Sequence, residues 1–85
     1  MREFEYTVTD EIGLHARPAG QLCKLAKTLD SRVTLKKGEK SADASRVIAV
    51  MGMAVKKGDT LKITVDGGDE EGSLAALERF FRENL

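Results

Sequence analysis

The sequence lacks the cysteine pairs that stabilise small secreted domains and the basic excess that is typical of nucleic-acid-binding proteins. Its 85 residues include one cysteine, so no disulfide can form within the chain. Fourteen Lys and Arg residues balance fourteen Asp and Glu residues, and this zero net charge argues against a general nucleic-acid binder, which normally carries a basic excess. The longest strongly apolar stretch, residues 47–55, is far too short to span a bilayer. We therefore expect no nucleic-acid partner and no insertion into a membrane.

Metal and nucleotide motifs are also missing from the sequence. One histidine and one cysteine cannot form a structural zinc site unaided, and no Gly-rich P-loop motif is present. We therefore expect no bound cofactor and no metal. The single cysteine, Cys23, lies on the apolar side of a helical pattern and is expected to be a small buried hydrophobic residue.

The composition that is present predicts one small globular domain, residues 1–85. Hydrophobic residues make up 41% of the chain and charged residues 33%, which is typical of a soluble folded protein. The first five residues are mostly charged and lack the apolar segment of a signal peptide, so we expect a cytoplasmic protein. We also expect it to be a monomer.

Changes in the period of the apolar residues predict the secondary structure. Alternation at 3–9, 32–36 and 61–65 predicts three strands, and residues 40–44 form a weaker fourth. Spacing of three and four predicts a helix of about 13 residues from Ala16, and another after its expected cap, Asp69. A short helix is expected to run from its cap, Ser45, to about Ala54. The order β-α-β-β-α-β-α predicts an α+β open-faced β-sandwich, with three helices on one face of a four-stranded antiparallel sheet.

One stretch, residues 13–20, carries residues with chemistry. His15 is the only histidine and falls just before the first helical residue, where free amide groups and the positive end of the helix dipole favour an anion such as phosphate. Arg17 adds a permanent charge with a forked array of donors. Because neutral imidazole is a nucleophile, these residues indicate a reversible phosphoryl acceptor. From position alone, an ordinary capping or surface histidine is the alternative interpretation.

The run Gly-Leu-His-Ala-Arg-Pro-Ala at residues 13–19 is highly specific. Together with the element order and the downstream pairs Val50-Met51 and Lys57-Gly58, it resembles HPr, the family of histidine-containing phosphocarriers of the bacterial sugar phosphotransferase system. The resemblance covers the whole chain. It implies that enzyme I, charged by phosphoenolpyruvate, phosphorylates His15 on Nδ1, and that Arg17 steadies the group. It further implies transfer to enzyme IIA domains of sugar permeases, by a stoichiometric carrier that is not itself an enzyme.

The short helix after residue 45 is apolar on almost all sides, which leaves two interpretations. The residues alone favour a helix buried on several sides, but Val47, Ile48 and Met51 share one face and would also form an exposed patch. The resemblance favours the second interpretation, because the equivalent helix forms the family's docking surface beside the histidine. Positive side chains around it would speed the encounter with acidic partners. The expected partner-binding residues are Gly20, Lys24, Lys27, Arg46, Val47, Ile48 and Met51.

The resemblance also bears on regulation. Many members of the family carry a serine at the start of this helix, which an ATP-dependent kinase phosphorylates. Arg46 occupies the equivalent position here and cannot accept the group, and its neighbour Ser45 is expected to cap the helix. Seryl regulation is therefore not expected. A regulatory protein-binding module acting outside sugar transport is the alternative function, and relay in a nitrogen- or metabolite-sensing branch is a weaker one.

Overall fold

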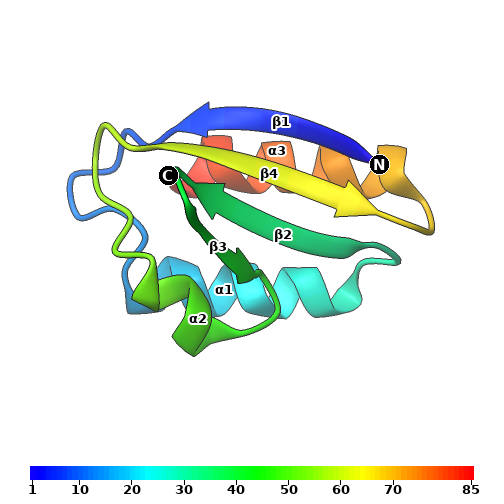
Figure 1. Ribbon diagram of the computed structural model, residues 1–85, viewed down its shortest axis with the longest axis horizontal. Coiled ribbons are helices and arrows are strands. Elements are labelled where there is room, and N and C mark those ends of the chain that lie inside the picture. Colours follow the sequence, from blue (N-terminus) through cyan, green and yellow to red (C-terminus); the bar gives the residue numbers. More distant parts are fainter.

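One antiparallel sheet and three helices make up the computed structural model, which describes all of residues 1–85 (Figure 1). The sheet has the strand order β1-β4-β2-β3, and each neighbouring pair is antiparallel. All three helices lie on one face of this sheet (Figure 1). The predicted fold class and element order are thereby confirmed. The elements are β1 (Arg2–Thr7), α1 (Ala16–Thr28), β2 (Arg32–Lys37), β3 (Lys40–Asp43), α2 (Val47–Gly52), β4 (Thr60–Asp66) and α3 (Glu70–Asn84).

The two central strands form the floor of the hydrophobic core. Leu61, Ile63 and Val65 of β4 are fully buried, because alternate residues of a strand point to the same face. Leu35 of β2 lies directly opposite Ile63 and is equally buried. The edge strand β1 ends at Thr7, two residues earlier than the alternation predicts. The chain leaves the ladder there, since the amide of the next residue donates to the carbonyl of Asp59 at 2.9 Å.

The long helices bury the predicted apolar faces against this floor. Leu22 and Ala19 of α1 are fully buried, as are Leu77 and Phe81 of α3. Asp69 caps α3 as predicted, because its side chain accepts a hydrogen bond from an amide of the first turn at 3.1 Å. By length and hydropathy, α1, α2 and α3 all fall short of a membrane-spanning helix.

The short helix α2 differs from its prediction at both ends. Ser45 does not cap it: the N-cap is Arg46, and no side chain bonds there. Instead, the amide and hydroxyl of Ser45 both donate to Asp43 Oδ1, at 2.9 and 2.7 Å. Asp43 lies two residues earlier and offers a local acceptor that turns the chain out of β3. The helix ends at Gly52, because Ala54 adopts a left-handed backbone with φ of 52° that an α-helix cannot contain.

Hydrogen bonds to their carboxylates lower the pKa of two aspartates, Asp43 and Asp59. For Asp43, the donors that lower the pKa are the hydroxyl and the amide of Ser45. For Asp59, they are the amide of Lys56 at 2.9 Å and the Lys37 ammonium at 3.2 Å. Each bond favours the ionised carboxylate, and none of them exists in the unfolded chain.

A third carboxylate, Glu70, behaves in the same way and leads to a prediction. Its pKa is lowered by the amide of Gly67 and by the N-terminal ammonium of Met1, which lies 3.0 Å from Glu70 Oε1. A pKa lowered by folding stabilises the protein above the unfolded value, near pH 4, and this stabilisation is lost as the pH falls through the folded value. We expect the urea midpoint to fall steadily from about pH 5 to pH 2. Asp43→Asn should weaken that dependence; a midpoint independent of pH would contradict the prediction.

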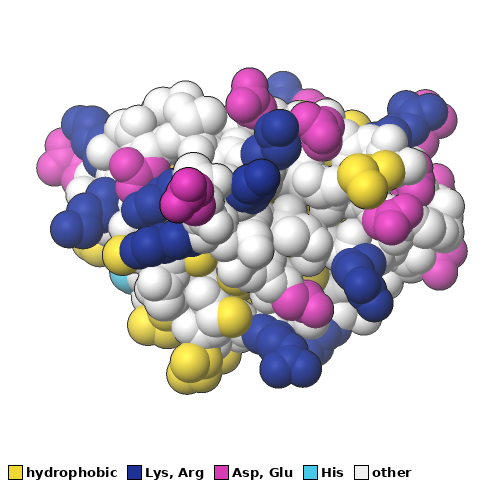
Figure 2. All heavy atoms as spheres, viewed as in Figure 1, with side chains coloured by type: hydrophobic (Ala, Val, Ile, Leu, Met, Phe, Trp, Pro, Cys, Tyr) yellow, Lys and Arg dark blue, Asp and Glu magenta, His cyan; other side chains and the backbone are white.

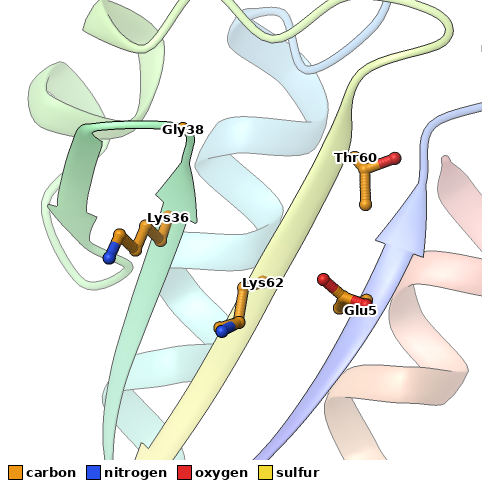
Figure 3. Close-up of a pocket in the computed structure, with 5 residues that line it drawn as sticks. All are labelled: Glu5, Lys36, Gly38, Thr60 and Lys62. Atoms are coloured by element: carbon orange, nitrogen blue, oxygen red, sulfur yellow. The ribbon is translucent and has the colours of Figure 1, made fainter.

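The uncovered face of the sheet is polar. A shallow hollow of about 250 Å³ lies there between β1, β4 and β2, lined by Glu5, Lys36, Gly38, Thr60 and Lys62 (Figure 3). The hydroxyl of Thr60 is within 2.9 Å of the hydroxyl of Thr7 on the neighbouring strand. The lining includes neither the histidine nor a hydrophobic side chain, so the candidate site lies elsewhere.

Candidate functional site

His15 occupies the N-cap position of α1. Its backbone is extended, with φ of −89° and ψ of −171°, and its carbonyl accepts the amide of Ala19 at 2.9 Å, which begins the helix. The imidazole makes no capping hydrogen bond, and the residue is half-buried. The ring is therefore held in place by the backbone while its nitrogens stay free to react with another molecule.

The first turn of α1 surrounds His15 with hydrogen-bond donors. Helix geometry leaves the amides of Ala16 and Arg17 without an intrahelical acceptor. The next residue, Pro18, is buried and has no amide hydrogen, so no donor is left buried without a partner. Two free amides at the positive end of the helix dipole favour an anionic group beside the ring.

A surface hollow of about 310 Å³ brings His15 and Arg17 together. Five residues line this His15 hollow: His15, Arg17, Pro18, Gln21 and Asn84. Arg17 is exposed and belongs to none of the ion pairs of the chain, so its guanidinium is free to meet an anion. Gln21 and Asn84 were not predicted from the sequence. Gln21 follows Arg17 by four residues, so the helical period alone places the two side chains on the same face of α1.

Asn84 comes from the far end of the chain, and nothing in the sequence around it indicates that it lies beside His15. Its Nδ2 donates to the carbonyl of Phe80 at 2.9 Å, which fixes the amide on the last turn of α3. The neighbouring Leu85 is buried, and its carbonyl accepts the amides of Thr9 and Asp10 at 2.6 and 2.9 Å. These bonds tie the end of α3 to the segment that leads into His15.

The segment before His15 is fastened to the loop that follows α2. Leu14 is buried, and its amide donates to the carbonyl of Val55 at 3.1 Å. Gly13 has φ of 82°, and a Cβ there would collide with the carbonyl oxygen of Val55 and come within 2.8 Å of Lys56 Cα. Only glycine therefore allows the close approach of backbones that sets the position of His15.

The loop after α2 is in turn fixed by Lys37 at the end of β2. Its ammonium donates to the carbonyl of Ala54 at 3.1 Å and to Asp59 Oδ2 at 3.2 Å. Both side chains of this ion pair are partly shielded from solvent, at 25% and 34% exposed. The Lys37 side chain thus fixes the loop that follows α2, and the backbone before His15 is bonded to this same loop at Val55.

The apolar residues of α2 divide between the core and the surface. Val50 is fully buried, whereas Ile48 and Met51 are 80% and 42% exposed. Val47 is half-buried and packs against the core, so it contributes less to the surface than expected. Exposed hydrophobic surface gathers over α2, and the cyan surface of the single histidine shows beside it (Figure 2). We call Ile48 and Met51 the α2 patch.

The other predicted partner-binding residues are all exposed. Gly20, Lys24 and Lys27 recur on α1 at spacings of four and three, which places them on one face of the helix, and Arg46 precedes α2. Cys23 is buried as predicted, and its thiol donates to the carbonyl of Ser45 at 2.7 Å, which links α1 to the start of α2.

Comparisons with known proteins agree with one another. A family model described as the PTS HPr component phosphorylation site matches residues 2–83. The phosphocarrier protein HPr of Mycoplasma capricolum is 37% identical over 79 residues, which cover 93% of this chain and 89% of that protein. The solved structure of a Mycoplasma histidine-containing phosphocarrier protein has a TM-score of 0.92 at 34% identity, with 96% of this chain and 93% of that chain covered. The Bacillus subtilis catabolite repression protein Crh, described as a swapped dimer, has a TM-score of 0.77 at 29% identity, with 100% and 98% covered.

Proposed function

Because the chain belongs to the HPr family of phosphocarriers of the phosphotransferase system, we propose that His15 accepts a phosphoryl group from phosphorylated enzyme I and passes it to enzyme IIA domains for sugar uptake. Residues 1–85 act as one HPr-like domain in the cytoplasm. The observation that carries this proposal is the free imidazole of His15, which shares a hollow with Arg17 at the start of α1. The chain is a reactant in this relay, and its partners supply the catalysis.

The transfer follows from the geometry around the ring. A lone pair on the neutral imidazole of His15 forms a new N–P bond while the bond between phosphorus and the donor's nitrogen breaks, and that bonding pair stays on the donor. The negative charge on the phosphoryl oxygens is stabilised by the guanidinium of Arg17 and by the free amides of Ala16 and Arg17. The same groups hold the phosphoryl group until the acceptor's nucleophile takes it in the reverse exchange.

Partners dock on the surface beside the ring. The α2 patch supplies the apolar contact, with the half-buried Val47 at its edge. Because apolar side chains exposed together mark sites of protein contact, we assign this surface to both donor and acceptor. The exposed charges nearby attract acidic partners and raise the rate of encounter. These charges form a basic rim of Arg17, Lys24, Lys27 and Arg46. Gly20 leaves room for close approach on α1.

Phosphoryl uptake from enzyme I tests the proposal. The purified chain is incubated with enzyme I, Mg²⁺ and phosphoenolpyruvate, and its intact mass is measured. We expect the gain of one phosphoryl group that is lost in mild acid, as an N–P bond requires. Reactions without enzyme I or without phosphoenolpyruvate are the controls. A folded chain that gains no mass would refute the function.

The likeness to Crh favours a second candidate, a regulatory module that binds proteins outside sugar transport. The α2 patch would serve such binding without any phosphoryl group. Arg46 at the position of the family's regulatory serine removes the best-known form of this role. Affinity capture with the immobilised chain separates the two candidates, because the carrier must recover enzyme I. A partner set that lacks enzyme I would favour the regulatory module.

A further inference from the structure

We propose that Ile12 is a second apolar docking contact, used by the phosphoryl donor when it approaches His15. The inference rests on the proposed function and extends its docking surface from α2 to the turn that precedes α1. Ile12 is 68% exposed, although isoleucine is among the residues most often found in protein interiors. It belongs to neither the α2 patch nor the basic rim.

The distribution of exposed apolar side chains supports this assignment. Only four large hydrophobic residues are exposed in the whole chain, and two of them form the α2 patch. A third, Met1, precedes β1, and its ammonium is paired with Glu70 at the start of α3. The fourth is Ile12.

The backbone holds Ile12 outward in a fixed turn. Asp10 Oδ2 accepts the amides of Ile12 and Gly13 at 3.2 and 3.1 Å, and the carbonyl of Asp10 accepts the amide of Gly13 at 3.1 Å. The amide of Asp10 is itself bonded to Leu85. Because the turn is already ordered, a partner that covers Ile12 loses little conformational entropy on binding.

The fold gives no reason for an apolar side chain at this position. The turn is built from the side chain of Asp10 and from the left-handed Gly13, so it needs nothing from the side chain between them. Ile12 is also absent from the hydrophobic core and from the residues packed against it. Its hydrophobicity is therefore available for binding and contributes little to folding.

Proximity to His15 brings Ile12 into the area that the donor covers. Three residues of extended chain span at most about 11 Å, so the Cα of Ile12 lies within that distance of the Cα of His15. A donor must bring its phosphorus atom into bonding contact with the imidazole, which places His15 near the centre of the contact area. A standard interface of about 800 Å² per partner corresponds to a circle with a radius of about 16 Å. A contact area of this size, centred on His15, therefore includes the position of Ile12.

The test compares Ile12→Ser with the parent in the initial rate of phosphoryl uptake from phosphorylated enzyme I. We expect the KM for the donor pair to rise about ten-fold, because an apolar contact is lost, with kcat unchanged since no group at the reacting atoms is altered. Ile12→Leu keeps the apolar contact and should restore the parent's KM. Ala75→Ser, which also introduces a hydroxyl but on the exposed face of α3, should leave the KM as it is.

The possible failures are distinguishable. If the parent is phosphorylated and Ile12→Ser has the same KM, the inference about Ile12 is wrong and the carrier function stands. If the parent takes up no phosphoryl group, the carrier function itself fails. Sedimentation of the parent and of Ile12→Ser tests whether a second copy of the chain covers Ile12. A parent dimer that Ile12→Ser dissociates, with an unchanged KM, would assign Ile12 to that contact and overturn the proposal.

Discussion

Replacement of His15 by alanine should abolish phosphoryl uptake from phosphorylated enzyme I and leave the fold intact. The change removes the only imidazole, and the other groups near it are poor substitutes. Cys23 is buried, with its thiol bonded to a backbone carbonyl, and the hydroxyl of Ser45 is bonded to Asp43. The His15 side chain makes no capping bond, so its truncation should cost about 0.5 kcal/mol or less in stability.

The intact mass of the His15→Ala protein measures its phosphoryl uptake, and urea denaturation measures its stability. Ser45→Ala serves as the matched control, because it removes a hydroxyl next to α2 and leaves the His15 hollow unchanged. It should take up one phosphoryl group, as the parent does. Uptake by His15→Ala at the parent's level would contradict the assignment. Acid-stable phosphate on that variant would place the group on a hydroxyl instead of a nitrogen.

Gly13→Ala should cause the largest loss of stability among the changes near the site. Alanine at a φ of 82° is strained, and its Cβ would overlap the carbonyl oxygen of Val55. Backbone strain and overpacking together should lower the free energy of unfolding by about 2 to 4 kcal/mol. The backbones must also separate, which moves His15 away from its support and slows phosphoryl uptake. Urea denaturation and the rate of uptake measure the two effects.

Gly20→Ala provides the control for this glycine. Gly20 lies inside α1, and a Cβ there would meet nothing within 4 Å. Alanine is favoured over glycine in the interior of a helix, so this change should raise the free energy of unfolding by about 0.5 to 1 kcal/mol. If Gly13→Ala were as stable as the parent, the close approach of Gly13 to Val55 would not hold in solution.

Local pattern was enough to predict most of the secondary structure. The strand predicted at 61–65 lies within β4 (Thr60–Asp66), because alternation is a property of neighbouring residues. The end of α2 was not predictable in the same way. It depends on Ala54 in a left-handed conformation and on the distant Lys37, which bonds to the Ala54 carbonyl. The prediction that Ser45 caps α2 was wrong, because its hydroxyl donates to Asp43 instead.

The candidate site shows the same division. His15 and Arg17 were predicted together because a single short motif carries both residues. Asn84 enters the hollow only because the chain folds back and the carbonyl of Leu85 bonds near residue 10. The exposure of Ile12 could not be predicted, because the residue lies in a turn and belongs to no periodic pattern of apolar residues.

The size of the contact area around His15 limits the order of events in the proposed relay. The molecule measures 32 × 25 × 21 Å, so a contact area with a radius of about 16 Å centred on the ring occupies most of one side. A ternary complex of donor, carrier and acceptor around one imidazole is therefore excluded sterically. In the proposed relay, the carrier must therefore leave the donor before it meets the acceptor.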